Sequence, residues 1–196
     1  MTGNPQLGDF FVVTHGRSII ARGIEWATGS PAYHAGIYVG EWSFTFGQTV
    51  YDCEPAVFEG RPGGAGFAPL SLYPDAVWST DGLHNSAGVP ITLTDAQRAI
   101  IVDKATHRAP NGMLGVSYGW INCFCIGLAR LFKWHATRFM RKVLASRKHA
   151  ECAQLVAILY TIAGVDLFVD GRPEGLVSPA NLLTSCLGTL MHGKEV

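Results

Sequence analysis

Cysteine, histidine and carboxylate side chains at three separate places in the chain could together carry out nucleophilic chemistry. Cys152 lies in the first turn of a predicted helix over His149–Ala163. The apolar residues that follow at i+3, i+4 and i+7 place it on the core-facing stripe: Leu155, Val156 and Leu159. The dipole and unpaired N–H groups at a helix N-terminus favour a thiolate, the nucleophilic form of cysteine. The alternative is a buried and inert thiol, because cysteine is among the most buried residue types.

His34 is the residue that could exchange a proton with such a thiol. It lies in a predicted strand over Tyr33–Val39, where it shares one face with Gly36, Tyr38 and Gly40. Glycine in a strand often marks the close approach of another backbone. A helix N-terminus lying across this small face would bring a cysteine near the imidazole. The alternative is a solvent-facing histidine on an edge strand.

Two carboxylates could orient that imidazole. Asp52 and Glu54 are two positions apart in the next predicted strand, Thr49–Glu54, and therefore lie on the same face of it. If this strand pairs with the preceding one as a hairpin around Glu41–Gly47, its far end returns beside His34. One carboxylate would then accept a hydrogen bond from the second imidazole nitrogen and fix its tautomer. The alternative is an ordinary polar hairpin face.

Other kinds of site find little support in the sequence. No GxSxG, GxGxxG or Walker motif is present, and we predict no cofactor. The five cysteines form no CxxC pair, which disfavours both a zinc ribbon and a disulfide scaffold. The remaining histidines show no ligand spacing with a carboxylate or with one another, so a metal site is not predicted: His15, His84, His107, His135, His149 and His192.

Length and composition predict one domain over residues 1–196. The chain has 196 residues, of which 48% are apolar and 15% charged, and this excludes a disordered chain and a solvated coiled coil. Fifteen basic residues balance fifteen acidic ones, so nothing in the overall charge favours nucleic acid as a partner.

The elements that must position these residues follow from periodicity and from turn residues. The predicted strands are Gly8–Thr14, Tyr33–Val39, Thr49–Glu54 and Val89–Leu93. Helices are predicted from Ser18 to Gly29, from the capping box at Thr94 to about Arg108, over Ser117–Lys133, over His149–Ala163, and from Ser178 to Leu183. A flexible loop is predicted over Gly60–Gly66. Strands clustered early in the chain indicate an α+β fold with an antiparallel sheet.

Two neighbouring segments bear on membranes and partners. Met113–Trp134 is the longest apolar stretch, and we interpret it as a buried or membrane-leaning helix rather than a membrane span. Arg130–Lys148 holds seven basic residues and no acidic one. It is either a solvated helix face or a contact with anionic lipid, cell-wall polymer or a partner subunit. The N-terminus shows no signal peptide, which predicts a cytoplasmic protein, or one carried in a phage particle, with peripheral membrane association open.

Taken together, the motifs resemble a known arrangement. The block Thr28–Gly40 around His34 resembles the opening of the NlpC-type cysteine hydrolases, more narrowly the circularly permuted, YiiX-like branch of the papain-like superfamily. In that branch the sheet histidine comes early and the nucleophilic cysteine comes late. Ala150–Val156 resembles its cysteine-bearing helix start, although Ala-Gln replaces the usual Ser-Glu after the cysteine. Thr49–Glu54 resembles its acidic strand, and Ser178–Leu182 its closing turn.

The resemblance implies a circularly permuted papain-like fold and a Cys–His–Glu hydrolase of bacterial or phage type. Cys152 would attack an amide or ester carbonyl, and His34 would protonate the leaving group. Glu54 would orient His34, with Asp52 as the alternative acid. The backbone N–H of Cys152 would donate to the oxyanion. Relatives act on peptidoglycan stem peptides, other amide bonds or lipid acyl groups, so a peptide or lipid-linked substrate is expected.

Two other classes of function stay open at this stage. One is a catalytically idle structural or binding module of a phage tail or envelope assembly that kept the fold. The other is a membrane-associated thiol acyltransferase, as in the related lecithin:retinol-like branch. Its membrane face would be formed by Met113–Trp134 and by the basic segment at about 130–148, which resembles an insertion before the cysteine helix.

Overall fold

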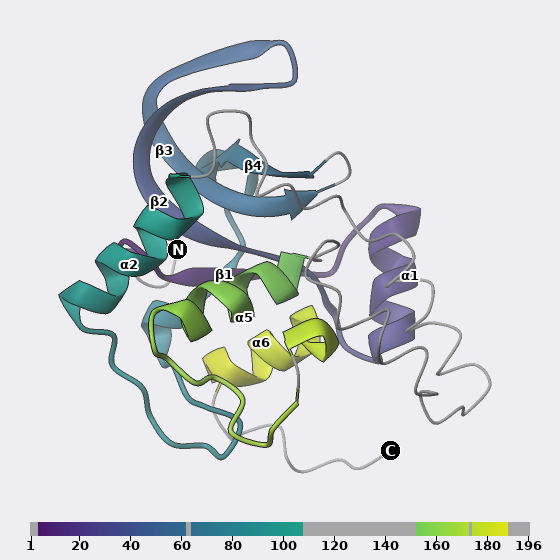
Figure 1. Ribbon diagram of the computed structural model, residues 1–196. Helices are drawn as coiled ribbons and strands as arrows, with labels where there is room; N and C mark the ends of the chain where they lie inside the picture. Colours follow the sequence, from purple (N-terminus) through teal and green to yellow (C-terminus); the bar gives the residue numbers. More distant parts are fainter. Residues whose placement is uncertain (1–3, 62–63, 108–151, 173, 188–196) are drawn as a thin grey trace.

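A five-stranded antiparallel sheet organises the fold, with strand order β4-β3-β2-β1-β5 (Figure 1). The computed structural model describes residues 4–61, 64–107, 152–172 and 174–187. The strands are β1 (Phe10–Thr14), β2 (Ala32–Phe46), β3 (Thr49–Arg61), β4 (Gly64–Pro69) and β5 (Val77–Trp78). The described helices are α1 (Ile19–Thr28), α2 (Asp95–Thr106), α5 (Cys152–Ile162) and α6 (Pro179–Leu187). The predicted α+β class with an antiparallel sheet is therefore confirmed.

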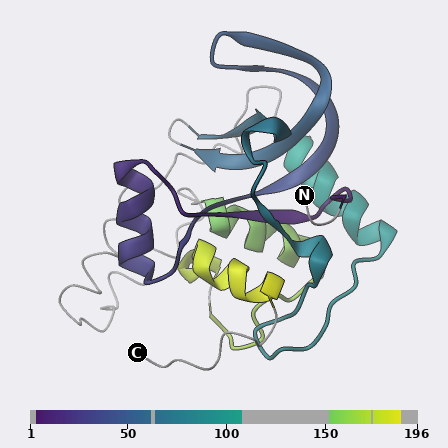
Figure 2. The same cartoon turned by 180° about the vertical axis from the view of Figure 1, so that it is seen from behind.

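The main core lies between the sheet and the helices. Helices α5 and α6 lie side by side along β1, whereas α1 and α2 lie at opposite ends of the sheet (Figures 1 and 2). Phe10 of β1 meets Tyr160 of α5 edge to face, with ring centroids 5.5 Å apart. The opposite face of the sheet carries a smaller apolar cluster around Phe11, Val57 and Trp78. The sheet is thus apolar on both faces, and β2 and β3 run through its middle.

Local signals place the helix ends where the sequence predicts them. The Ser18 hydroxyl accepts a hydrogen bond from the Ala21 N–H at 3.0 Å, and Gly29 ends α1 in the left-handed region at φ 65°. Thr94 and Gln97 form the complete capping box that begins α2. These ends depend on residues within one turn of each other, which is why they can be predicted without tertiary information.

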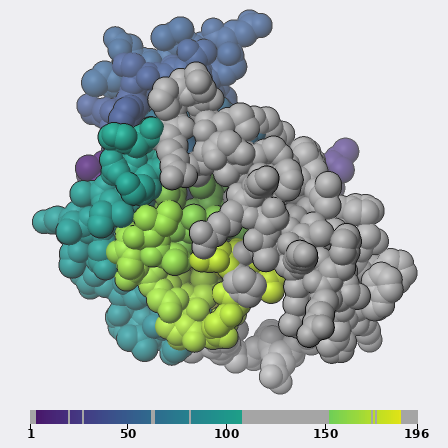
Figure 3. Space-filling model, in the orientation of Figure 1, coloured from purple at the N-terminus to yellow at the C-terminus, as the bar shows by residue number. Residues whose placement is uncertain are grey.

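The β2–β3 hairpin is longer than predicted. Its turn lies at Gly47 and Gln48, between the paired residues Phe46 and Thr49, and β3 runs on to Arg61. Ala56–Phe58 is buried throughout, since β3 is a central strand covered on both faces, so this part shows no apolar–polar alternation. Figure 3 shows the outer part of the hairpin projecting as a lobe above α2.

Two predicted segments are wrong. In place of a flexible loop over Gly60–Gly66, the described residues belong to the β3–β4 ladder, where Gly60 pairs with Ala65 and Arg61 with Gly64. Gly60, Gly64 and Gly66 lie in paired strands whose neighbours satisfy the backbone. Val89–Leu93 is not a strand, because its backbone forms only one isolated bridge, between Pro90 and His84. Proline cannot donate to a ladder, which weakens strand pairing there.

Several predictions lie outside the described residues. They concern the helix over Ser117–Lys133, the basic segment Arg130–Lys148, and residues 149–151 of the predicted His149–Ala163 helix. Within the part of the chain that the structure describes, no helix has both the length and the apolar character needed to cross a membrane.

Candidate active site

The imidazole of His34 lies between a sulfur atom and a carboxylate. Its Nε2 is 2.8 Å from Oε2 of Glu59, and its ring also hydrogen-bonds the side chain of Cys152. Because Glu59 occupies Nε2, Nδ1 is the ring nitrogen left for the sulfur. Cys152 and Glu59 are only 3% and 2% exposed. Cysteine, histidine and carboxylate therefore form one buried chain of contacts, and the predicted pairing of Cys152 with His34 is present.

A bulge in β2 positions the histidine. The register between β1 and β2 shifts between Val13, which pairs with His34, and Thr14, which pairs with Ala32. Tyr33 is the extra residue in β2. A bulge of this kind bends a strand and re-aims the side chains beside it, and bulges are common next to active sites.

We expected the cysteine helix to lie across the face of β2 that carries Gly36, but it does not. A Cβ at Gly36 would lie 2.7 Å from the Phe11 ring and 2.9 Å from the Phe58 carbonyl oxygen, so Phe11 fills that face. Helix α5 packs against the opposite face, where Phe10 meets Tyr160. The predicted proximity of Cys152 and His34 is therefore correct. The explanation of Gly36 is wrong, because the residue makes room for the Phe11 ring and not for the cysteine helix.

The carboxylate at His34 is Glu59, which corrects the expectation of Glu54 or Asp52. In the ladder Gly36 pairs with Glu59, whereas the exposed Glu54 pairs with Trp42 nearer the hairpin turn. Asp52 accepts a hydrogen bond from the Ser43 hydroxyl at 2.7 Å. At about 3.3 Å per residue, Glu54 lies roughly 17 Å along the strand from Glu59.

The signal that could have identified Glu59 is the turn itself. A two-residue connection at Gly47 and Gln48 fixes the register, and pairs counted back from it bring residues near position 60 opposite His34. Our prediction placed the turn too broadly, around Glu41–Gly47, and ended β3 too early. The inference that the far end of β3 returns beside His34 is correct once the strand has its full length.

Tyr73 and Arg61 complete the surroundings of Glu59, and sequence reasoning missed both. The Tyr73 hydroxyl donates to Oε2 of Glu59 at 2.5 Å, and its ring centroid lies 5.8 Å from that of His34. Arg61 Nη1 is 3.9 Å from Oε1 of Glu59. Tyr73 follows the short turn Leu70–Leu72, far from any motif, so no sequence pattern indicated it.

Neighbouring groups shift the pKa values of His34, Glu59 and Tyr73. Burial works to lower the pKa of His34, but the neighbouring Cys152 and Glu59 outweigh it and raise that pKa to about 10. For Glu59, burial acts to raise the pKa, whereas the hydrogen bonds from His34 and Tyr73 bring it below its usual range. The pKa of Tyr73 is raised by burial and by the negative charge of Glu59. At neutral pH the site therefore holds a charged imidazolium and a charged carboxylate.

Cys53 is an exposed thiol in a different environment. Its Sγ lies 3.7 Å from Oε2 of Glu41, and the negative charge of Glu41 raises the pKa of Cys53. Exposure alone therefore does not make Cys53 a good nucleophile at neutral pH. Among the described residues, no group of three or more histidine, cysteine or acidic side chains is placed to hold a metal ion.

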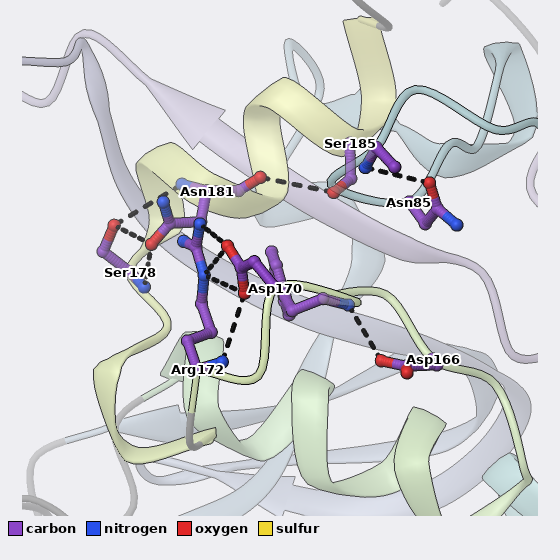
Figure 4. A network of polar contacts seen from close by, with 9 residues as sticks. Asn85, Asp166, Asp170, Arg172, Ser178, Asn181 and Ser185 are labelled. Atoms are coloured by element: carbon purple, nitrogen blue, oxygen red, sulfur yellow. Dashed lines mark hydrogen bonds and ion pairs between the residues drawn. The ribbon is translucent and has the colours of Figure 1, made fainter.

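The closing turn before α6 has a structural role. Asn181 Oδ1 accepts hydrogen bonds from the backbone N–H and the hydroxyl of Ser178, each at 2.9 Å (Figure 4). The Asn181 N–H in turn donates to the Ser178 hydroxyl at 3.4 Å. Ser178 is thus the helix cap that the sequence predicts. The same view shows the ion pair between Asp170 and Arg172 in the preceding loop.

Comparison with known proteins gave no match to any protein-family model, and no curated protein matches the chain.

Proposed function

We propose that the protein is a cysteine hydrolase with a circularly permuted papain-like arrangement, in which Cys152 is the nucleophile. The observation that supports this proposal best is the position of His34 between Cys152 and Glu59. The chain order also fits, because the strand histidine precedes the cysteine helix. Glu59 takes the orienting role that the resemblance implies for Glu54.

In the proposed reaction, the Cys152 thiolate attacks the carbonyl carbon of an amide or ester. The backbone N–H of Cys152 donates to the oxyanion that forms. The His34 imidazolium then gives its Nδ1 proton to the leaving amine or alcohol, and a thioester remains on the sulfur. Neutral His34 next takes a proton from water, and the hydroxide attacks the thioester carbonyl. The C–S bond then breaks, which releases the carboxylic acid and restores the Cys152 thiolate beside the His34 imidazolium. Throughout, Glu59 accepts from Nε2–H and so keeps Nδ1 directed at the sulfur.

The first test of this proposal is the order in which the thiols react. Iodoacetamide at neutral pH should alkylate Cys152 ahead of Cys53 and Cys186, as mapped by mass spectrometry, although Cys53 is the exposed thiol. A p-nitrophenyl ester should leave an acyl group on Cys152, and release of free acid should follow. Peptide amides, including peptidoglycan stem peptides, then test the amide class. Faster labelling of Cys53 than of Cys152 would contradict the proposal.

Single substitutions test the roles of His34 and Glu59 in the reactivity of Cys152. His34→Gln should slow alkylation and ester cleavage by roughly 10²-fold or more, because it removes the proton-transfer group. Glu59→Gln should slow both reactions less, and Glu54→Gln on the same strand is the matched control that should leave them unchanged. Equal effects of Glu59→Gln and Glu54→Gln would remove the role given to Glu59. A Cys152 that forms a thioester but passes the acyl group to an amine instead of water would indicate an acyltransferase.

A further inference from the structure

The two oxygens of Glu59 have different partners. Oε2 accepts from both Nε2 of His34 at 2.8 Å and the Tyr73 hydroxyl at 2.5 Å. Oε1 faces Nη1 of Arg61 at 3.9 Å, which is too long for a hydrogen bond. Among the described residues, the carboxylate is thus held by hydrogen bonds at one oxygen and only attracted by a charge at the other.

Arg61 is a competitor for this carboxylate. Its Nη1 is buried and donates no hydrogen bond to any residue that the structure describes. Its guanidinium carbon lies 4.6 Å from the centre of the Phe46 ring, which holds the group close to Glu59. A buried donor without a partner is costly, so a shift of the carboxylate toward Arg61 would relieve that cost. The same shift would take Glu59 away from His34.

Tyr73 is placed to prevent that shift. Its ring packs against Phe11 at 4.7 Å and His34 at 5.8 Å between centroids, which fixes the direction of the hydroxyl. That hydroxyl donates to Oε2, the oxygen that His34 uses, and so favours the position in which Oε2 stays at the imidazole. The raised pKa of Tyr73 keeps the hydroxyl protonated as a donor across the neutral range.

We propose that Tyr73 is a positioning residue whose hydroxyl holds Glu59 on His34 against the attraction of Arg61. This inference deepens the proposed function and depends on it. It assigns Tyr73 no contact with substrate. The Tyr73 hydroxyl and the Arg61 guanidinium compete for the Glu59 carboxylate. The His34 imidazole keeps its orientation as long as Tyr73 holds that carboxylate.

The test removes each competitor in turn. Tyr73→Phe keeps the ring packing and deletes only the hydroxyl, so the carboxylate should move to Arg61. The rate of Cys152 alkylation by iodoacetamide near pH 6 should then fall about tenfold, the order expected for loss of one charge-assisted hydrogen bond. Arg61→Gln in the same chain should restore most of that rate, because the competitor is gone. Arg61→Gln alone should change the rate little.

The rate is followed from pH 5 to 10 together with the proton resonance of His34 Nε2–H. In the part of the chain that the structure describes, the groups that titrate or carry charge at this site are Cys152, His34, Glu59, Arg61 and Tyr73, with Tyr33 close to Tyr73. The hydrogen-bonded Nε2–H signal should disappear in Tyr73→Phe and return in the double variant. A purely structural role for Tyr73 would not predict recovery on removal of Arg61.

Tyr160→Phe is the control for loss of a buried tyrosine hydroxyl, which here donates to the Gly8 carbonyl at 2.9 Å. It should lower the melting temperature and leave the pH profile unchanged. An unaltered profile in folded Tyr73→Phe, or no recovery with Arg61→Gln, would overturn the positioning role alone. Wild-type Cys152 that reacts no faster than in His34→Gln would remove the proposed function as well.

Discussion

At the scale of single residues, the central feature is the His34 imidazole, which contacts both Cys152 and Glu59. A buried histidine on its own would lose its proton more easily than one in water. In this site the sulfur of Cys152 and the carboxylate of Glu59 reverse that tendency, so the proton is bound more tightly in the folded protein than in the unfolded chain. A contact of this kind has a consequence for stability, which can be measured without any substrate.

Stability should depend on pH through His34. Its pKa rises from an ordinary 6.5 to about 10 on folding. The stabilisation is therefore fully present below about pH 6.5 and is lost as the pH rises through about 10. Urea unfolding of wild type and His34→Gln should show a difference in unfolding free energy that shrinks over this window, by at most about 1.4 kcal/mol per pH unit. A difference that stays constant from pH 6 to 10 would contradict this assignment.

The β2–β3 hairpin is the element that brings the catalytic candidates together. The bulge at Tyr33 sets the direction of His34, and the pairing of Gly36 with Glu59 sets which carboxylate it meets. Gly36 is where the hairpin tolerates least change, since the Phe11 ring and the Phe58 backbone leave no room for a side chain. The site therefore depends on close packing two residues away from its histidine.

Alanine substitutions at two glycines should have opposite effects. Gly36→Ala should lower the free energy of unfolding by roughly 1–3 kcal/mol, because its Cβ would overlap the Phe11 ring. Gly23→Ala in α1 meets nothing within 4 Å and should raise it by roughly 0.5–1 kcal/mol through helix propensity. Thermal and urea unfolding measure both variants. A Gly36→Ala protein as stable as wild type would show that the Phe11 ring can move aside.

At the scale of the whole molecule, Asp9 ties together parts that are distant in sequence. Its Oδ1 accepts from Arg98 of α2 at 2.7 Å, and its Oδ2 accepts from the Thr80 hydroxyl at 2.5 Å and from the Gln6 N–H at 2.8 Å. Asp9 is only 2% exposed. Through these hydrogen bonds, the Asp9 carboxylate connects the start of β1 to α2 and to the short turn after β5.

Loss of the Asp9 carboxylate should destabilise the fold. Asp9→Ala leaves Arg98 without its buried partner and should lower the free energy of unfolding by roughly 3–5 kcal/mol. Asp103→Ala, which breaks exposed ion pairs with Lys104 and His107 on the same helix, is the control and should have almost no effect. Chemical unfolding provides the comparison. Similar effects of the two variants would mean that the Asp9 network contributes little to stability.

Sequence alone determined the features that depend on near neighbours. The caps at Ser18, Thr94 and Ser178 were predictable because each involves hydrogen bonds within one turn of helix. The pairing of His34 with Cys152 also came from the sequence, through residue type, local element and motif resemblance. In each case the information lay in a short stretch of chain.

Only the tertiary structure decided which groups surround the imidazole. Glu59 replaced Glu54 because the register and length of a hairpin are set by its turn and by burial on both faces, which local alternation does not report. Tyr73 and Arg61 reach Glu59 from a turn and from a strand end, and no periodic pattern links them. Such contacts arise when long-range packing closes the chain on itself, so the choice of partner follows from the folded arrangement as a whole.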